Sequence, residues 1–181
     1  MSTDHVNEPE DELPGKSSEP DERTPMASEH WLELKLPPVV VFGLFAVVMW
    51  AISQYFPVFA VEIPFQYYLT AFLMIIAIWI SIYSLYLFYK NRTTVHPQNP
   101  GDTNKLVTSG PFRHTRNPMY LALSLILIGW AIFLSDLLAL MLMPLYYAYM
   151  TRFQIIPEER ELQQKLGSEY EKYADRTPRW L

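Results

Sequence analysis

Four stretches without a charged side chain constrain this chain more than any other feature of its sequence. They cover residues 39–56, 67–89, 119–134 and 137–150. A helix needs about 20 apolar residues to cross the hydrocarbon core of a bilayer, a length that the second stretch exceeds and the first approaches. The fourth reaches it by extending to Ile156, with Arg152 snorkelling toward the headgroups. The sequence therefore predicts an all-α integral membrane protein with about four transmembrane helices.

The third and fourth stretches are separated only by Ser135 and Asp136, which predicts a tight helical hairpin. The buried core of a soluble protein is the alternative interpretation of such apolar segments. Four of them so close together would leave almost no polar residues to cover them, whereas a helix that is apolar on all sides suits lipid. The membrane interpretation is therefore favoured.

Lysine and arginine residues fall on one side of the predicted spans. Residues 90–117 contain five of them and residues 151–181 contain six, whereas the connections 57–66 and 135–136 contain none. Positive charges mark the cytoplasmic ends of membrane helices. The distribution predicts that both termini and both basic segments lie in the cytoplasm.

Residues 1–30 differ in character from the rest of the chain. They contain nine acidic residues, two basic residues and no aromatic residue, whereas the remaining chain carries two net positive charges. With little apolar surface to offset the entropy of ordering, this segment is predicted to be a disordered acidic tail. It would serve as a solvated tether or bind a partner that the sequence does not identify. Residues 31–89 then hold the first two spans, and residues 90–181 hold the polar segments and the hairpin.

Composition excludes or disfavours several classes of site. The chain has no cysteine, which rules out disulfides, thiolate zinc sites and a cysteine nucleophile. It has no G-x-G arrangement for a dinucleotide and no long basic stripe for nucleic acid. His96 and His114 lack the i, i+4 partner of a helical metal pair, so no metal site is expected.

The polar segment before the third stretch is too rich in Pro, Gly and Asn for a long helix. Ser109-Gly110-Pro111 predicts a turn, and Pro118 suits the first turn of the third helix, where its missing N–H costs nothing. Asn117 is the expected cap of that helix, whose free N–H groups would then face an anion. Arg113 and Arg116 are three residues apart and would share a face if this stretch turned helically.

The second polar segment begins with Pro157-Glu158-Glu159, which predicts a helix start with acidic residues in its first turn. An apolar and aromatic stripe follows at helical spacing, formed by Leu162, Leu166, Tyr170 and Tyr173. Gly167 is expected to interrupt the helix. The stripe predicts an amphipathic cytoplasmic helix that lies against the membrane or closes over the first polar segment.

Taken in order, these motifs resemble a known family. They are Leu106-Val-Thr-Ser-Gly-Pro-Phe-Arg-His-Thr-Arg-Asn-Pro-Met-Tyr120, the apolar hairpin, Pro157-Glu-Glu-Arg-Glu-Leu162, Leu166-Gly-Ser-Glu-Tyr170, Tyr173 and Arg179-Trp180. Their order and spacing are similar to those of the isoprenylcysteine carboxyl methyltransferase family of integral membrane enzymes, which also resembles phospholipid N-methyltransferases. The resemblance implies a cytoplasmic S-adenosylmethionine site formed by the loop, the hairpin and the terminal helix, with a lipophilic acceptor arriving from the bilayer.

The resemblance and the chemistry of S-adenosylmethionine assign candidate roles. Arg113 or Arg116 could hold its carboxylate through a bidentate guanidinium pair. Glu158 or Glu159 could take its ammonium or ribose hydroxyls, and Tyr120 could line the purine or the methyl path. The candidate cofactor-binding residues are Gly110, Arg113, His114, Arg116, Asn117, Pro118, Tyr120, Glu158 and Glu159. Arg152 and Glu159 are the candidate catalytic residues, Arg152 to steer or neutralise the acceptor.

Methyl transfer is an in-line displacement from a donor already activated by its sulfonium charge. Alignment and exclusion of water therefore supply much of the acceleration, and no metal is needed. His114 is a further candidate as a general base. The chain departs from the family pattern at Asn117, where the prenylcysteine enzymes show His, and at Ala122 and Leu123, which replace a small Gly. The acceptor stays open between a prenylcysteine-like carboxylate, a lipid amine and a small thiol.

Two other functions compete with this interpretation. A sterol-type membrane reductase has a similar loop-and-hairpin organisation and binds NADPH, and a non-catalytic membrane adaptor would use the acidic tail for partners. The candidate residues also have structural interpretations. Arg113 and Arg116 suit lipid-headgroup anchors, the two glutamates suit the dipole of a helix start, and Tyr120 suits a membrane interface.

Overall fold

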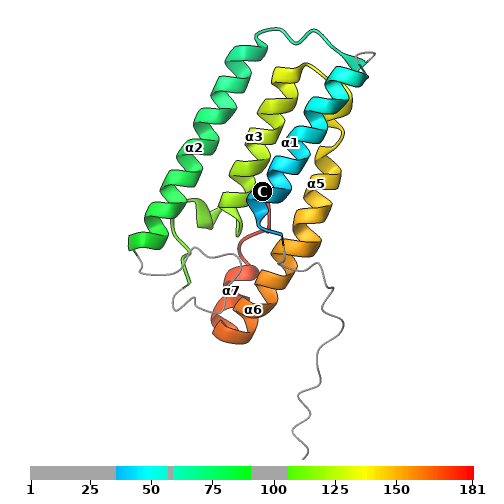
Figure 1. Ribbon diagram of the computed structural model, residues 1–181. Coiled ribbons are helices and arrows are strands. Elements are labelled where there is room, and N and C mark those ends of the chain that lie inside the picture. Colours follow the sequence, from blue (N-terminus) through cyan, green and yellow to red (C-terminus); the bar gives the residue numbers. More distant parts are fainter. Residues whose placement is uncertain (1–35, 57–58, 91–105) are drawn as a thin grey trace, which may run out of the picture.

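The computed structural model describes residues 36–56, 59–90 and 106–181. Three long helices, α1 (Pro38–Tyr55), α2 (Gln66–Lys90) and α3 (Pro118–Leu134), lie side by side with a fourth helical segment that contains α5 (Met143–Met150) (Figure 1). Along the chain, α1, α2, α3 and this fourth segment alternate in direction. The described residues form no strand, only an isolated bridge between Ala60 and Asp136. The acidic tail 1–30 and most of the segment before Leu106, including His96, lie outside the described residues.

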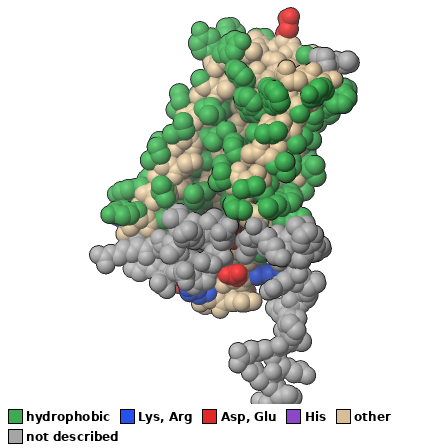
Figure 2. Space-filling view, in the orientation of Figure 1, with side chains coloured by type: hydrophobic (Ala, Val, Ile, Leu, Met, Phe, Trp, Pro, Cys, Tyr) green, Lys and Arg blue, Asp and Glu red, His purple; other side chains and the backbone are tan. Residues whose placement is uncertain are grey.

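Helices α1 and α2 are long and apolar enough to cross a membrane, and α3 is a shorter apolar helix. Less than a quarter of the most apolar part of α1 or α2 is buried inside the protein. Their outward side chains are large and apolar, with Val39 and Ile75 each 66% exposed, and apolar groups cover this part of the molecule (Figure 2). This exposure argues against the buried core of a soluble protein. The all-helical prediction is confirmed, whereas the count of four spans stays a prediction.

Helix α3 lies at the centre of the packing and contacts α1, α2 and α5. Two hydrogen bonds to backbone carbonyls tie these helices together. Thr70 Oγ1 on α2 donates to the Gly129 carbonyl of α3 at 3.1 Å, and the Trp130 indole donates to the Ala46 carbonyl of α1 at 3.0 Å. The buried core between the helices includes Val41, Met49, Leu127, Met143, Tyr146 and Met150. The helices therefore form one body with a common core.

The hairpin after α3 turns as tightly as its two-residue connection predicts. Ser135 adopts the left-handed conformation, with φ of 53°, and ends α3. Asp136 then caps α4 (Leu137–Leu140), because its side chain accepts a hydrogen bond of 2.8 Å from the Ala139 N–H. The turn of the hairpin thus lies at the end of the molecule opposite the polar elements (Figure 1).

The fourth apolar stretch departs from the single helix that the sequence predicts. Helix α4 ends at Leu140, and α5 begins at Met143 and continues through a π-helical turn, η4 (Thr151–Ile155), into α6 (Ile156–Leu166). The predicted helix start at Pro157 is confirmed, since α6 begins at Ile156 with Glu158 and Glu159 in its first turn, although the π-helical turn leads into it without a break. Proline lacks the N–H for a regular helical bond. The wider turn before it, closed by the Ile156 N–H on the Thr151 carbonyl, accommodates it.

The polar elements gather at one end of the molecule, where α2 ends and α3 begins (Figure 1). They are the short 3₁₀ helix η3 (Gly110–Arg113), α6 and α7 (Ser168–Ala174). Gly167, with φ of 51°, separates α6 from α7, which confirms the predicted interruption. Charged side chains appear at this end in the space-filling view (Figure 2). The orientation of this end relative to a membrane stays a prediction.

Candidate active site

The loop that carries the first motif is anchored against α2. Gly110 has φ of 60°, and a Cβ there would lie 2.8 Å from both Leu87 Cδ1 and Tyr83 Cε1, so only glycine fits this turn without strain. Phe112 is buried, with its ring 5.2 Å from that of Phe88. The predicted turn at Ser109-Gly110-Pro111 is confirmed as the start of η3. The loop therefore lies in a fixed place beside the end of α2.

The two arginines of this loop have different environments. Arg113 and His114 are exposed, whereas the side chain of Arg116 is 14% exposed. The shared face expected for Arg113 and Arg116 does not form, because η3 ends at Arg113. The Arg116 backbone N–H then donates to the Pro178 carbonyl at 2.9 Å instead of to a helical partner. Of the two arginines, the fold brings Arg116 into the interior.

Arg116, Glu159 and Arg179 form an ion-pair cluster between the loop and α6. Arg116 Nη2 lies 3.3 Å from Glu159 Oε1, and Arg179 Nη2 lies 2.8 Å from Glu159 Oε2. Arg179 Nε also donates to both Glu159 oxygens, at 3.1 and 2.9 Å. Two guanidinium groups thus share one carboxylate. The cluster keeps one net positive charge.

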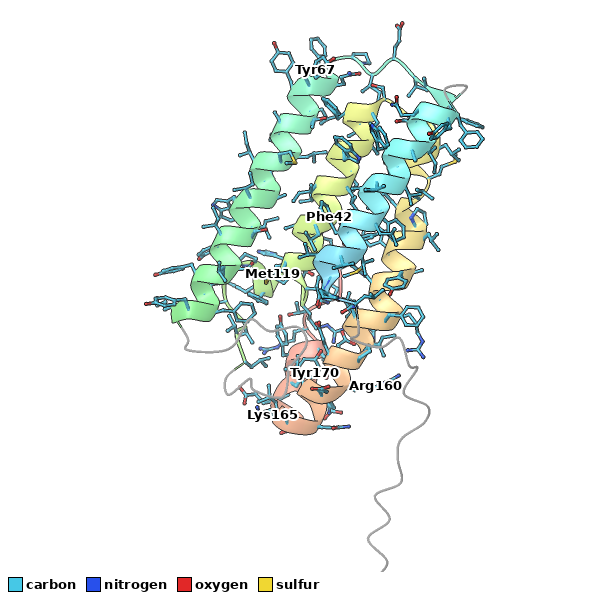
Figure 3. All side chains as sticks on the ribbon, viewed as in Figure 1. Phe42, Tyr67, Met119, Arg160, Lys165 and Tyr170 are labelled. Atoms are coloured by element: carbon cyan, nitrogen blue, oxygen red, sulfur yellow. The ribbon has the colours of Figure 1, made fainter. Side chains whose placement is uncertain are left out.

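The Arg116 guanidinium makes one further hydrogen bond and has one donor without a partner among the described residues. Its Nη1 donates to Tyr170 Oη at 3.4 Å, and burial raises the pKa of Tyr170 to about 12. Arg116 Nε is buried and has no hydrogen-bond partner among the described residues. Tyr170 lies on α7 beyond the end of α3 that carries Met119 (Figure 3). A buried, unpaired donor on a cation is costly unless an anion completes it.

A second polar pair lies beside this cluster. The hydroxyl of Tyr120, buried in the first turn of α3, donates a hydrogen bond to Oε1 of Glu158 in the first turn of α6. Burial raises the pKa of Glu158 to about 8, opposed by this hydrogen bond and reinforced by the negative charges of Glu159 and Glu161. Burial therefore favours the protonated form of Glu158. The adjacent glutamates 158 and 159 have distinct states, one paired with a phenol and one with cations.

Pro118 is buried as the first residue of α3, as predicted. Asn117 occupies the cap position, but its side chain caps nothing, so this part of the prediction was wrong. Its Nδ2 instead donates to the Arg179 carbonyl at 3.0 Å. The same carbonyl accepts a hydrogen bond of 2.9 Å from Thr115 Oγ1. A partner 62 residues away therefore orients this amide, and its oxygen does not accept the capping bond from α3.

Sequence reasoning assigns no individual role to three residues of this region. It places Tyr170 and Tyr173 in an apolar stripe, yet Tyr173 Oη donates to the Phe112 carbonyl at 2.8 Å and so fastens α7 over the loop. Arg179 enters only as part of a motif. The signal that could have identified the tyrosines is their choice over phenylalanine on a buried face, because a buried hydroxyl usually has a hydrogen-bond partner. Helix α7 therefore packs over the loop. The sequence predicts either this arrangement or a helix that lies against the membrane.

Arg152 lies on the π-helical turn η4, half-buried, with its guanidinium carbon 5.6 Å from the centroid of the Phe153 ring. It belongs to the same continuous helical segment as Glu158 and Glu159, and π-helical turns are frequent at functional sites. Its role toward an acceptor stays a prediction.

Comparison with known proteins identifies the family of this chain. The sequence profile of the phospholipid methyltransferase family matches residues 65–169, more than half of the chain, from the start of α2 into α7. An uncharacterized protein of Haemophilus influenzae is 40% identical over 63 residues, which are 35% of this chain and the whole of that protein. No solved structure matches. The predicted relation to membrane methyltransferases is confirmed, and the chain belongs to the phospholipid methyltransferase family.

Proposed function

We propose that this membrane methyltransferase uses S-adenosylmethionine, bound between the loop 115–120 and α6, and transfers its methyl group to a lipid acceptor. The observation that carries the proposal is the partly buried Arg116, whose buried Nε is unpaired among the described residues. An acidic residue and a phenol–carboxyl pair lie next to it. This combination suits a zwitterionic ligand that also carries a sulfonium charge.

The residues present fit the charges of this cofactor. Its carboxylate needs a guanidinium donor, and Arg116 offers one within a cluster that has one net positive charge. Binding there would give the unpaired Nε an anionic partner and would remove the cost of leaving it unsatisfied. Arg113, which is exposed, is the weaker candidate for the same role.

Glu158 is the proposed partner of the positively charged groups of the cofactor, its ammonium and sulfonium. Burial raises the pKa of this carboxyl group to about 8, and a nearby ammonium or sulfonium would favour its ionised form. Tyr120 holds it in place through their hydrogen bond. We assign Glu158 to the ammonium or the ribose hydroxyls and Tyr120 to the wall of the methyl path.

When bound, S-adenosylmethionine supplies a methyl group already activated by the sulfonium charge. The contribution of the protein is then alignment and exclusion of water. Arg116 fixes the amino-acid end of the ligand, and Glu159 orients Arg116. Tyr120 and the apolar start of α3 keep water from the reacting atoms. Arg152, on the π-helical turn before α6, is proposed to steer or neutralise the acceptor.

A lipid amine is the first acceptor to test, because the family is described by its action on phospholipids. The full chain in detergent or nanodiscs is incubated with methyl-labelled S-adenosylmethionine and membrane lipids, and the lipid extract is analysed for label. We expect label in a lipid product and saturable binding of S-adenosylhomocysteine by calorimetry. Saturable NADPH binding without S-adenosylhomocysteine binding would instead indicate a reductase, and binding of neither would indicate an adaptor.

A further inference from the structure

Residues Thr177–Trp180 pack against the loop that precedes α3. We refer to these four residues as the clasp. Three consecutive loop residues donate to its backbone. The Arg116 N–H bonds the Pro178 carbonyl at 2.9 Å, and the side chains of Thr115 and Asn117 bond the Arg179 carbonyl at 2.9 and 3.0 Å. The middle of the clasp, at Pro178 and Arg179, is therefore fastened to the loop.

The far end of the clasp is fastened to the π-helical turn. The Trp180 indole donates to Thr151 Oγ1 at 3.1 Å, and its ring meets the Tyr147 ring edge-on, with centroids 4.7 Å apart. The clasp thus connects the loop before α3 to the segment that leads into α6. These two segments carry Arg116 and Glu159.

Arg179 contacts both the loop before α3 and Glu159 on α6. Its carbonyl accepts from the loop, while its side chain directs Nε and Nη2 at the two oxygens of Glu159. The Arg179 contacts, at 2.8 to 3.1 Å, are closer than the 3.3 Å contact of Arg116 with the same carboxylate. Glu159 is therefore held mainly by Arg179.

We propose that Arg179 is a positioning residue for the methyltransferase site: by holding Glu159, it keeps Arg116 available for the carboxylate of the ligand. Arg179 itself touches no ligand in this proposal, which rests on the proposed function. Without Arg179, the carboxylate of Glu159 has Arg116 as its remaining cationic partner in the cluster. The pair then closes into a bidentate contact that uses the donors of Arg116. The clasp brings Arg179 to this place through its backbone bonds.

The test compares the affinity for S-adenosylhomocysteine of the wild type, Arg179→Ala, Arg179→Lys and the double variant Arg179→Ala with Glu159→Gln. We expect about a tenfold loss in Arg179→Ala, a contribution typical of one charge-assisted contact. Arg179→Lys should recover part of the loss, because lysine pairs as a point charge without the bidentate fork. The double variant should bind better than Arg179→Ala, because a neutral amide at position 159 no longer captures Arg116.

Arg176→Ala is the matched control, since Arg176 is exposed on the same segment and donates to the Lys172 carbonyl at 3.0 Å. Thermal unfolding is measured for every variant. If Arg179→Ala does not fold, Arg179→Gln takes its place in both comparisons.

Unchanged affinity in a folded Arg179→Ala, or a loss that Glu159→Gln fails to relieve, overturns the inference in favour of a purely structural clasp. A wild type that binds no S-adenosylhomocysteine overturns the proposed function and this inference with it. Wild-type binding combined with unchanged affinity in the variant overturns this inference alone.

Discussion

The hydroxyl of Tyr120 donates a hydrogen bond to Oε1 of Glu158, and this bond joins the first turn of α3 to the first turn of α6 across 38 residues of sequence. Burial raises the pKa of Glu158 to about 8. The pair therefore couples a proton to the packing of two helices at the candidate site. Three of the predictions below follow from it directly.

The first prediction concerns stability and pH. The folded-state pKa of Glu158, about 8, lies above the ordinary value of 4.5, so between these values the folded protein binds more protons than the unfolded chain. The stability contribution of protonated Glu158 is complete below pH 4.5 and is lost as the pH rises through 8. We expect the thermal midpoint to fall over this window in the wild type and to fall less in Glu158→Gln. Equal slopes in both proteins would contradict the assignment.

The second prediction concerns protons released on binding. A positively charged ligand next to Glu158 favours its ionised form, so S-adenosylmethionine should bind more tightly as the pH rises toward about 8, the pKa of this carboxyl group. Calorimetry at neutral pH in two buffers with different ionisation enthalpies should show proton release in the wild type and less in Glu158→Gln. Identical release by both proteins would show that another group titrates.

The third prediction tests the phenol. Tyr120→Phe removes the hydrogen bond that lowers the pKa of Glu158, so this pKa should rise further. Leaving a buried carboxyl group without its donor should cost about 1–3 kcal/mol of unfolding free energy. Tyr68→Phe is the control, because Tyr68 is 77% exposed. Denaturant or thermal unfolding in the same detergent measures both, and equal stabilities would argue against a structural role for the bond.

The fourth prediction separates the two arginines of the loop. Arg116→Ala should weaken S-adenosylhomocysteine binding by about tenfold to a hundredfold, the range for a charge-assisted contact in a buried site. Arg113→Ala, at an exposed position three residues earlier, should change it little. Calorimetric titration of the two variants checks this. Comparable losses in both would favour a general electrostatic effect of the loop over a specific contact of Arg116.

The fifth prediction concerns the turn against α2. Gly110→Ala introduces a Cβ 2.8 Å from Leu87 and Tyr83 at a φ of 60° and should cost about 1–3 kcal/mol. Gly43→Ala on α1 is the control, because nothing lies within 4 Å of its added Cβ and alanine favours a helix. Unfolding midpoints should fall for the first variant only. A tolerated Gly110→Ala would show that the loop moves freely.

The first three apolar helices could be predicted from the sequence to within a residue or so at each end. Helix α2 begins at Gln66 and ends at Lys90, one residue beyond each end of the uncharged stretch, because apolar composition over such a length leaves few other structures. The hairpin at Ser135 and Asp136 and the interruption at Gly167 follow from short local patterns. Both features depend on the backbone preferences of a few neighbouring residues, which can be predicted from the sequence.

The composition of the candidate site depended on contacts between distant residues. The loop spacing does not distinguish Arg113 from Arg116, whereas in the fold the Arg116 N–H bonds the Pro178 carbonyl of the clasp and its side chain contacts Glu159. The Asn117 amide donates to the Arg179 carbonyl and does not cap α3. The π-helical turn lies directly before Pro157 in a continuous helical segment. Local propensities are worth a few tenths of a kcal/mol to about 1 kcal/mol. Hydrogen bonds to a segment some 60 residues away are worth at least as much. The tertiary structure therefore decides these contacts, and the local sequence does not predict them.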